Sequence, residues 1–348
     1  MTMPAGGPDI GAIQTTRRGY WLKQLRRLPP ETGVVFVLVL AVVYLSLTQP
    51  YFLTEENLRL IAKQSAGIGI LAVGMTFVIA IGGIDISVGS VVGFCSLVLG
   101  ALAVLEGWSL PAALLACLAA GALCGLINGV IIARAGMPSI IATLAMFAAA
   151  RAGALVVHAG GHISNIPSPL VNMAQSDFAG VPVVAWIAGV VAVAGIIILN
   201  RTRVGRQVLA LGGNREASRM SGVKIDRIEI AVYTVMGMLA GLAAIITTAR
   251  GATADPNAGT TWEFQAITAV VLGGTPIIGG SASVIGSILG VLTLTVLRDG
   301  VTLANLDSNI QQLIIGAALL LAVEVERWRV RRARSVGAKL QTKGAGGA

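Results

Sequence analysis

The feature that most constrains this sequence is a series of long apolar stretches, each close to the length of a membrane-crossing helix. A helix needs about 20 apolar residues to cross the ~30 Å hydrocarbon layer of a bilayer, and roughly 17 is the practical minimum. Such stretches predict spans at residues 33–48, 65–82, 86–105, 111–133, 138–157, 181–199, 229–248, 263–279, 282–297 and 308–324. The expected fold is therefore all-α and polytopic, with about ten transmembrane helices.

The composition excludes a soluble globular protein. Hydrophobic residues make up 55% of the chain, charged residues make up 12%, and the mean hydropathy is +0.83. The formal charge of +9 would suit a nucleic-acid-binding protein, but the basic residues alternate with apolar spans and aromatic residues are only 5% of the chain. The positive-inside rule accounts better for the charge, so no nucleic-acid partner is expected.

The pair of spans at 263–279 and 282–297 departs from the general pattern. The run from Phe264 to Leu297 carries no charge, but several helix-breaking residues interrupt it: Gly273, Gly274, Pro276, Gly279 and Gly280. Two full crossings need about 40 residues, and this run is shorter. We therefore expect one leg of the pair to be short, broken or re-entrant.

The distribution of Lys and Arg predicts the orientation of the chain. With the N-terminus inside, cytoplasmic segments carry 20 of the 25 basic residues, external segments carry four, and Arg151 falls within a span. Both termini are therefore expected in the cytoplasm, and the first span is expected to remain uncleaved. The predicted divisions are a cytoplasmic tail at 1–30, a transmembrane domain at 31–326, a cytoplasmic loop at 200–228, external loops at 158–180 and 250–262, and a cytoplasmic tail at 327–348.

The cytoplasmic loop holds a pattern typical of a short capped helix. Asn214 suits an N-cap, Glu216 lies in the first turn, and Gly222 can end the helix after Ser221. A helix this short is unstable alone in water, which favours a lever that inserts into a groove of a partner. The alternative is a solvated basic loop that serves topology alone. The residues of the predicted lever are Asn214, Arg215, Glu216, Ala217, Ser218, Arg219, Ser221 and Gly222.

Three polar residues in or near the spans are candidates for a solute pathway or for a structural motif. Asp85 and Ser87 belong to the motif GGIDISVGS, and Asn128 lies within the fourth span. Ionisable groups in spans are costly and often functional, whereas a carboxylate at a span end can simply cap a helix. Asn128 can face a solute or hydrogen-bond another helix.

Other side chains suggest ordinary structural roles. Arg151, near the outer end of its span, is expected to snorkel or to tether a loop. The three cysteines, all inside apolar runs, are expected to be small buried hydrophobes. His158 and His162 lack the glutamate of a zinc-binding HExxH motif, so no metal site is expected there.

The sequence contains no motif for catalysis or for an energy source of its own. There is no Gly-Lys dipeptide, so the phosphate-binding loop GxxxxGK[ST] is missing. There is also no GxSxG nucleophile motif and no cluster of membrane carboxylates. If the chain moves a solute uphill, another protein must supply the energy.

The Gly-rich motif near Asp85 has an echo later in the chain. Gly82-Gly83 is followed after five residues by Gly89-Ser90, and the same spacing recurs from Gly273-Gly274 to Gly280-Ser281. Two interpretations remain open: an internal duplication, or Gly-rich turns that arose independently.

Five segments together resemble one family. They are GGIDISVGS at 82–90, PSIIATLAMFAAAR at 138–151, RTRVGRQVLALGGNREASRMSGVKI at 201–225, TADPNAGTTWEF at 253–264 and AVVLGGTPIIGGSASVIGSILG at 269–290. Over about residues 50–325, the chain is similar to the membrane permease subunits of ribose/xylose-type ABC sugar importers.

This resemblance implies a fold similar to the vitamin B12-type importer permeases, in a bacterial inner membrane. It implies a second permease, either an identical copy or a paralogue, and two cytoplasmic ATPase subunits that bind ATP and Mg. It also implies a periplasmic sugar-binding protein, whereas this chain would hold no cofactor and no catalytic residue. The family's coupling element falls on Gly213 to Gly222. The loop with Asp255, Pro256 and Asn257, and the loop at 158–180, would face the binding protein.

Several positions differ from the residues common in such permeases. They are Ala145, Ala152, Pro276, Ala282 and the run Trp262-Glu263-Phe264. These differences weaken an assignment to ribose but leave the resemblance intact. The alternative function is an autonomous secondary transporter or facilitator of small polar solutes, which would work without an ATPase.

Overall fold

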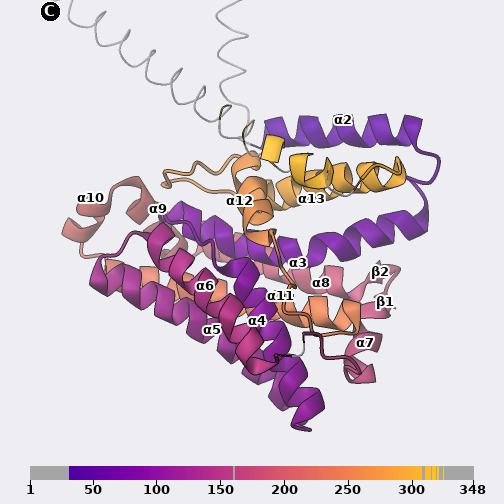
Figure 1. Cartoon of the computed structure of the whole chain (residues 1–348). Coiled ribbons are helices and arrows are strands. Elements are labelled where there is room, and N and C mark those ends of the chain that lie inside the picture. Colours follow the sequence, from indigo (N-terminus) through magenta and orange to yellow (C-terminus); the bar gives the residue numbers. More distant parts are fainter. Residues whose placement is uncertain are drawn as a thin grey trace, which may run out of the picture.

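The computed structural model describes residues 31–324, apart from 160, 308, 309, 315, 319 and 321–323, and is mostly helical (Figure 1). A two-residue hairpin, β1 (Asp177–Phe178) with β2 (Val181–Pro182), accompanies the helices. The helices are α2 (Thr32–Thr48), α3 (Glu55–Ala80), α4 (Val88–Gly100) with its π-helical extension η1 (Ala101–Leu105), α5 (Leu110–Ala135), α6 (Ser139–Val157), α7 (Ser168–Gln175), α8 (Val183–Arg201), α9 (Arg203–Gly213), α10 (Arg215–Met220), α11 (Ile225–Gly251), α12 (Trp262–Leu272) and α13 (Val284–Leu303).

In the part of the chain that the structure describes, seven helices are long and apolar enough to cross a membrane. They are α3, α4 with η1, α5, α6, α8, α11 and α13, and the apolar helices α2 and α12 are shorter. These findings make the chain a multi-pass membrane protein. The predicted span at 308–324 lies partly outside the described residues, and the predicted tails at 1–30 and 327–348 lie wholly outside them.

Helices α3 and α11 form the interior of the bundle. Helix α3 packs against α8, α11, α12 and α13, while α11 packs against α3, α4 and α5 (Figure 1). Most of the apolar side chains of α3 are buried, whereas α5, α6 and α8 expose many of theirs. Helix α2 lies at the edge and packs on α13.

Glycines allow α5 and α11 to approach at backbone distance. A Cβ atom added at Gly237 would lie 2.1 Å from the carbonyl oxygen of Gly121, and one added at Gly125 would lie 2.0 Å from that of Tyr233. Gly121 and Gly125 are four residues apart, the small-xxx-small spacing that favours close packing of membrane helices. The contact therefore depends on the absence of side chains.

Hydroxyl and amide side chains join helices within the apolar core. Thr76 of α3 pairs with Ser287 of α13 at 2.7 Å, and Ser96 of α4 pairs with Thr248 of α11 at 2.7 Å. At the other end of α13, buried Asp299 accepts a hydrogen bond of 2.8 Å from Asn57. Such bonds satisfy groups that would otherwise be costly to bury.

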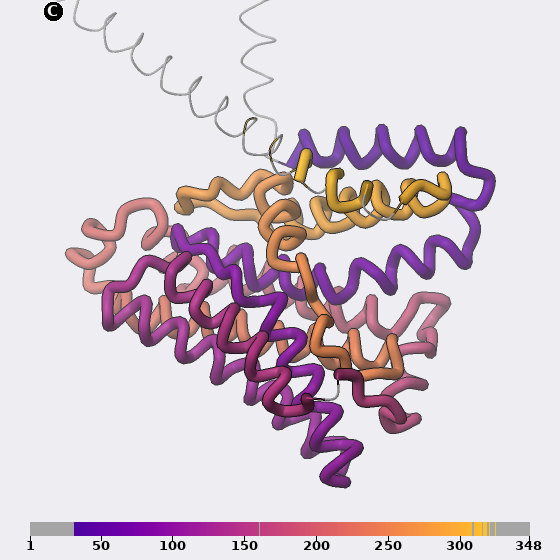
Figure 2. Tube along the Cα trace, in the orientation of Figure 1, coloured from indigo at the N-terminus to yellow at the C-terminus, as the bar shows by residue number. Residues whose placement is uncertain are grey.

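The predicted span at 263–279 is short, as expected for one leg of the charge-free pair, because α12 ends at Leu272. Its helix has 11 residues, and the segment 254–261 before it is not helical. Figure 2 shows this segment as an extended trace that rises from the end of α11 into α12. Gly259 and Thr261 both have positive φ, at 77° and 68°, which prevents the helix from beginning earlier.

The non-helical segment lies along α4. The backbone N–H of Asp255 donates to Ser96 Oγ at 3.1 Å, and a Cβ atom at Gly93 would lie 2.3 Å from the carbonyl oxygen of Pro256. Further along, a Cβ atom at Gly89 would lie 2.4 Å from the carbonyl oxygen of Gly259. Small residues on α4 therefore provide the groove that holds this extended backbone.

Candidate functional site

A short capped helix stands at one end of the bundle, where the sequence predicts the lever. Helix α10 runs from Arg215 to Met220, and the side chain of Asn214 accepts a hydrogen bond of 2.9 Å from the N–H of Ala217. After Ser221, Gly222 has a φ of 81°, the left-handed conformation typical of a residue that ends a helix. The helix is one residue shorter than predicted, because Ser221 is its C-cap.

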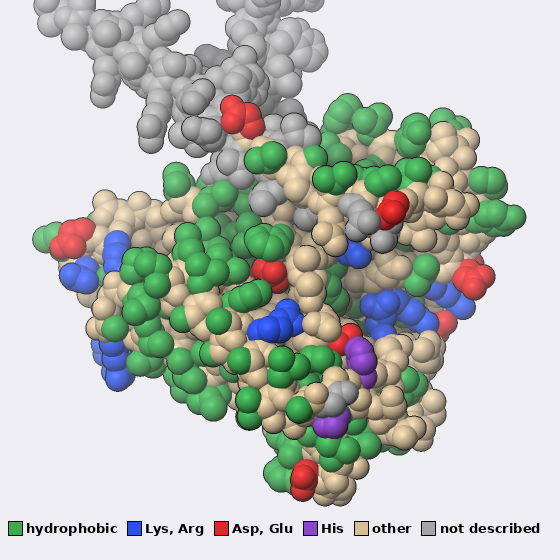
Figure 3. Space-filling model, in the orientation of Figure 1, with side chains coloured by type: hydrophobic (Ala, Val, Ile, Leu, Met, Phe, Trp, Pro, Cys, Tyr) green, Lys and Arg blue, Asp and Glu red, His purple; other side chains and the backbone are tan. Residues whose placement is uncertain are grey.

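Most of the surface of α10 is exposed. Glu216, Ala217, Arg219, Ser221 and Gly222 are exposed. Ser218 is buried, and its backbone carbonyl oxygen accepts a hydrogen bond from the N–H of Val223. Met220 is 84% exposed, which is unusual for so apolar a side chain and was not expected from the sequence. Figure 3 shows acidic and basic side chains gathered at this end of the molecule.

Arg215 connects α10 to α11. Its guanidinium donates two hydrogen bonds to the carboxylate of Glu229, one of them at 3.0 Å from Nη2 to Oε2. The Glu229 side chain is 5% exposed and that of Arg215 is 50% exposed. A bidentate bond of this kind fixes the relative orientation of two elements as well as their distance.

A second connection joins the preceding helix α9 to α3 through backbone alone. A Cβ atom at Gly212 would lie 1.9 Å from the carbonyl oxygen of Ala80 and 2.6 Å from the backbone N of Gly280. The same carbonyl of Ala80 accepts a hydrogen bond of 3.0 Å from the N–H of Gly280. The end of α9, the end of α3 and the loop between α12 and α13 therefore meet at one point, which we call the glycine junction.

The glycine junction brings the two Gly-rich motifs together. A Cβ atom at Gly279 would lie 2.7 Å from the backbone N of Gly82, and both glycines have positive φ. The two motifs therefore lie at the same end of the bundle, as the predicted topology placed them.

A cavity of about 390 Å³ opens beside the ion pair of Arg215 and Glu229. Its walls come from the loop after α3, the end of α5, the start of α6 and the start of α11, and include Gly83, Ser139 and Tyr233. Arg215, the first residue of α10, and Glu229 are both among its lining residues.

The three polar candidates near the spans form one chain of hydrogen bonds. Asn128 Nδ2 donates to Ser87 Oγ at 3.1 Å, and Ser87 Oγ donates to Asp85 Oδ1 at 2.6 Å. All three side chains are at most 2% exposed, and their hydrogen bonds connect the segment before α4 to α5. A role in a solute pathway stays a prediction. The interpretation of Asp85 as the N-cap of the next span is wrong, because Ser87 holds that position and Asp85 accepts from its N–H.

The candidates for binding-protein docking, Asp255, Pro256 and Asn257, lie in the extended segment beside α4. Asp255 Oδ1 accepts from the N–H of Asn257 at 2.7 Å and lies 3.4 Å from Nδ1 of His162. Arg151 donates to the carbonyl oxygen of Pro256 at 2.6 Å, so its expected role as a loop tether is confirmed. Docking of a binding protein on this segment stays a prediction.

The described residues include no group of three or more His, Cys, Asp or Glu side chains that could hold a metal ion. Cys95, Cys117 and Cys124 are buried and unpaired by disulfides, which confirms their interpretation as small core residues. The described features at α10 are a capped helix, the Arg215–Glu229 ion pair and, through α9, the glycine junction.

The chain is similar in sequence to known proteins over most of its length. Residues 57–323 match the family described as the branched-chain amino acid transport system / permease component. The ribose import permease protein RbsC of Escherichia coli (strain K12) is 39% identical over 308 residues, which cover 85% of this chain and 93% of the relative. No solved structure matches the chain.

Relatives with other names also cover most of the chain. The L-arabinose ABC transporter permease protein AraH of Azospirillum brasilense is 34% identical over 330 residues, or 94% of this chain and 96% of the relative. The xylose transport system permease protein XylH of Escherichia coli (strain K12) is 29% identical over 364 residues, or 86% of this chain and 93% of the relative. This chain therefore belongs to the family of branched-chain amino acid transport system permease components.

Proposed function

We propose that this chain is the transmembrane permease subunit of an ATP-driven ABC importer that carries a monosaccharide, such as a pentose, across the bacterial inner membrane. The importers named for ribose, arabinose and xylose support the substrate class. The proposal includes about ten spans, cytoplasmic termini and a fold similar to vitamin B12-type importer permeases. A second permease, either a copy or a paralogue, would complete the pathway.

The observation that carries the proposal is the pair of connections behind α10. Glu216, Arg219 and Met220 are exposed and can enter a groove on an ATPase subunit. Behind them, the Arg215–Glu229 pair connects α10 to α11, and the glycine junction connects α9 to α3. A movement of the ATPase would thus reach the two interior helices of the bundle. ATP and Mg would be bound by the partner subunits.

A periplasmic binding protein would deliver the sugar on the opposite side. The candidate contact elements are α7 with the β1–β2 hairpin, and the segment that contains Asp255. An antiparallel bridge between Ile163, which precedes α7, and Ala254 joins the two loops. This bridge holds the two predicted docking loops side by side, and we expect the binding protein to contact both. Membrane lipid would cover the exposed apolar faces of helices such as α5 and α8.

The test is ATP-driven uptake in vesicles that contain the chain, its ATPase and its binding protein. Replacing Glu216→Lys or Met220→Ser should leave expression intact but abolish uptake, because each alters the exposed face of α10. Full uptake in both variants would refute the coupling role of α10. ATP-independent flux through the purified chain alone would instead favour a facilitator.

A further inference from the structure

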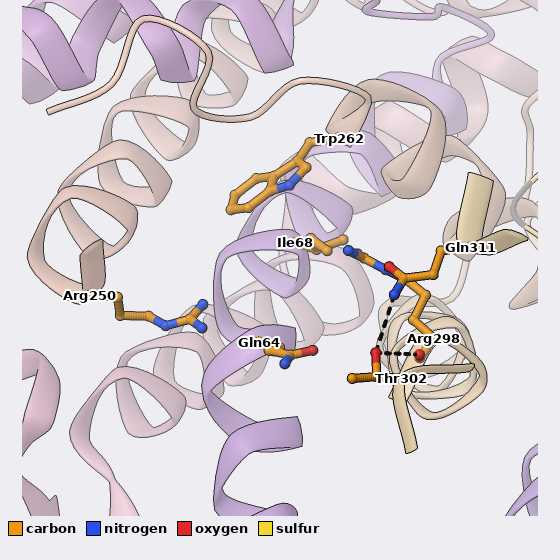
Figure 4. Close-up of a pocket in the computed structure, with 7 residues that line it drawn as sticks. All are labelled: Gln64, Ile68, Arg250, Trp262, Arg298, Thr302 and Gln311. Atoms are coloured by element: carbon orange, nitrogen blue, oxygen red, sulfur yellow. Dashed lines mark hydrogen bonds between the residues drawn. The ribbon is translucent and has the colours of Figure 1, made fainter. Parts of the chain in front are cut away.

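A second cavity, of about 260 Å³, lies at the end of the bundle opposite α10. Its walls come from α3, the end of α11, the start of α12 and the last turns of α13 (Figure 4). This volume is below the ~300–1,000 Å³ typical of sites for drug-sized ligands, so it suits a smaller molecule.

The cavity combines one aromatic ring with several hydrogen-bonding side chains. Figure 4 shows the amide of Gln64 and the guanidinium of Arg250 pointing into the same space beneath the indole of Trp262. Arg298 lies on the far side, together with Thr302. Amide and hydroxyl groups both donate and accept hydrogen bonds, and guanidinium groups donate several.

Neighbouring residues fix these side chains in place. A Cβ atom at Gly67 would lie 2.7 Å from Cη2 of Trp262, so the indole packs directly against the bare backbone of α3. Arg298 donates to Gln265 Oε1 at 2.7 Å and, more weakly, to Gln311 Oε1 at 3.4 Å. Gln311 in turn donates to Thr302 at 3.2 Å. The wall is therefore organised before any ligand arrives.

Arg250 remains available to a ligand. Among the described residues it forms no ion pair, and the cavity lining includes no carboxylate. A neutral polyol can accept hydrogen bonds from Arg250 through its hydroxyl oxygens and present the apolar face of its ring to Trp262.

We propose that this cavity is a monosaccharide-binding site at the outer end of the permease, with Trp262 as the stacking surface and Gln64 and Arg250 as hydroxyl partners. The inference rests on the proposed function, because that function supplies the class of ligand. The site would receive the sugar before it enters the pathway. Its affinity is expected to be weak, since a pathway that held its cargo tightly would release it slowly.

The test is saturation-transfer NMR on the full chain in nanodiscs, with D-ribose, D-xylose and L-arabinose as probes. At least one sugar should receive saturation from the wild-type chain. Trp262→Leu and Gln64→Ala should each weaken that binding about fivefold, the effect of losing one favourable contact. Trp186→Leu is the matched control, because Trp186 is not among the cavity's lining residues and its indole N–H donates to the carbonyl oxygen of Phe178.

A second pair of variants tests the position of the indole without removing it. Gly67→Ala should displace the ring and weaken sugar binding, whereas Gly69→Ala meets its nearest neighbour, Ile288, at an ordinary 3.8 Å and should not. Thermal unfolding of each variant checks that it is folded.

Three results would overturn the proposal. They are the absence of transfer to any sugar in the wild-type chain, equal binding in Trp262→Leu and Gln64→Ala, and displacement of the sugar by inorganic phosphate with an affinity that exceeds the sugar's own. ATP-driven uptake by the wild-type complex, measured separately, keeps the two claims distinct. Uptake without binding at this cavity refutes the inference alone, and binding without uptake refutes the proposed function alone.

Discussion

The half-exposed guanidinium of Arg215, on α10 at the bundle end, donates two hydrogen bonds to the buried carboxylate of Glu229 on α11. The charge of Glu229 is thereby compensated by a residue whose other face is open to a partner. A connection of this kind can carry force in both directions, because the two bonds resist rotation as well as separation.

Replacing Arg215 by Ala should therefore destabilise the chain and uncouple it from its ATPase. The change leaves a buried carboxylate unpaired, which costs about 3–5 kcal/mol in a fully buried pair and about 1–3 kcal/mol here, because Arg215 is half exposed. Thermal unfolding in nanodiscs measures the stability. Arg219→Ala, on the same helix, is the control and should leave the unfolding temperature unchanged; an equal loss in both variants would contradict the role of the pair.

The glycine junction gives a sharper test of transmission. Gly212→Ala places a Cβ atom 1.9 Å from the carbonyl oxygen of Ala80, so α9 must move away from α3. Gly213→Ala meets its nearest neighbour at 3.9 Å and is the matched control. We expect Gly212→Ala to lower ATP-driven uptake strongly and Gly213→Ala to retain it. Equal uptake in the two would show that the close approach is dispensable.

The contact between α5 and α11 should be equally intolerant of added volume. Gly237→Ala is expected to cost about 1–3 kcal/mol, because its Cβ atom would overlap the Gly121 carbonyl. Gly189→Ala, on α8 with no neighbour within 4 Å, should be neutral or stabilising by about 0.5–1 kcal/mol. Chemical or thermal unfolding distinguishes the two, and similar values for both would argue against tight packing.

Asp85, in the loop between α3 and α4, predicts a pH dependence of stability. Burial raises the pKa of this carboxyl above its ordinary value, and the hydrogen bonds from Ser87 partly oppose the rise. Its contribution to stability is therefore complete at acidic pH, below the ordinary pKa, and is lost as the pH rises through the raised native pKa. Asp85→Asn keeps the acceptor oxygen without the charge.

The Asp85→Asn variant should consequently match the wild type at acidic pH and exceed its stability at neutral pH. Unfolding temperatures measured in a series of buffers from acidic to neutral would show this as a flatter profile. A profile parallel to that of the wild type would mean that another group is responsible. Asp226→Asn, a change in the first turn of α11, serves as a control for the removal of one negative charge.

The sequence predicted those elements that depend on residues close together in the chain. The apolar runs predicted the seven long apolar helices, although not a count of ten spans. Asn214 and Gly222 located α10 almost to the residue, and the glycines after Leu272 predicted the short α12. Each of these depends on residues within one or two turns of one another.

The remainder depends on packing between distant segments. In the sequence, Arg215 belongs to a charged loop and Glu229 to a predicted span, and the spacing between them does not predict that their side chains are in contact. The contact of Gly212 with Ala80 and Gly280 could not be predicted either. The sequence does not distinguish a glycine that packs against a carbonyl oxygen from one that forms a turn. The exposure of Met220, the last residue of α10, was not predicted, because an apolar side chain in a short helix ordinarily suggests burial.

The extended segment before α12 has a mechanical consequence. In α3 or α11, reorienting one half of the span against the other would break several consecutive helical hydrogen bonds. Helix α12 is preceded by backbone that takes no part in such a ladder, so it can tilt about Thr261 with few of these bonds lost. The groove of small residues on α4 would then hold the extended backbone in place while α12 tilts.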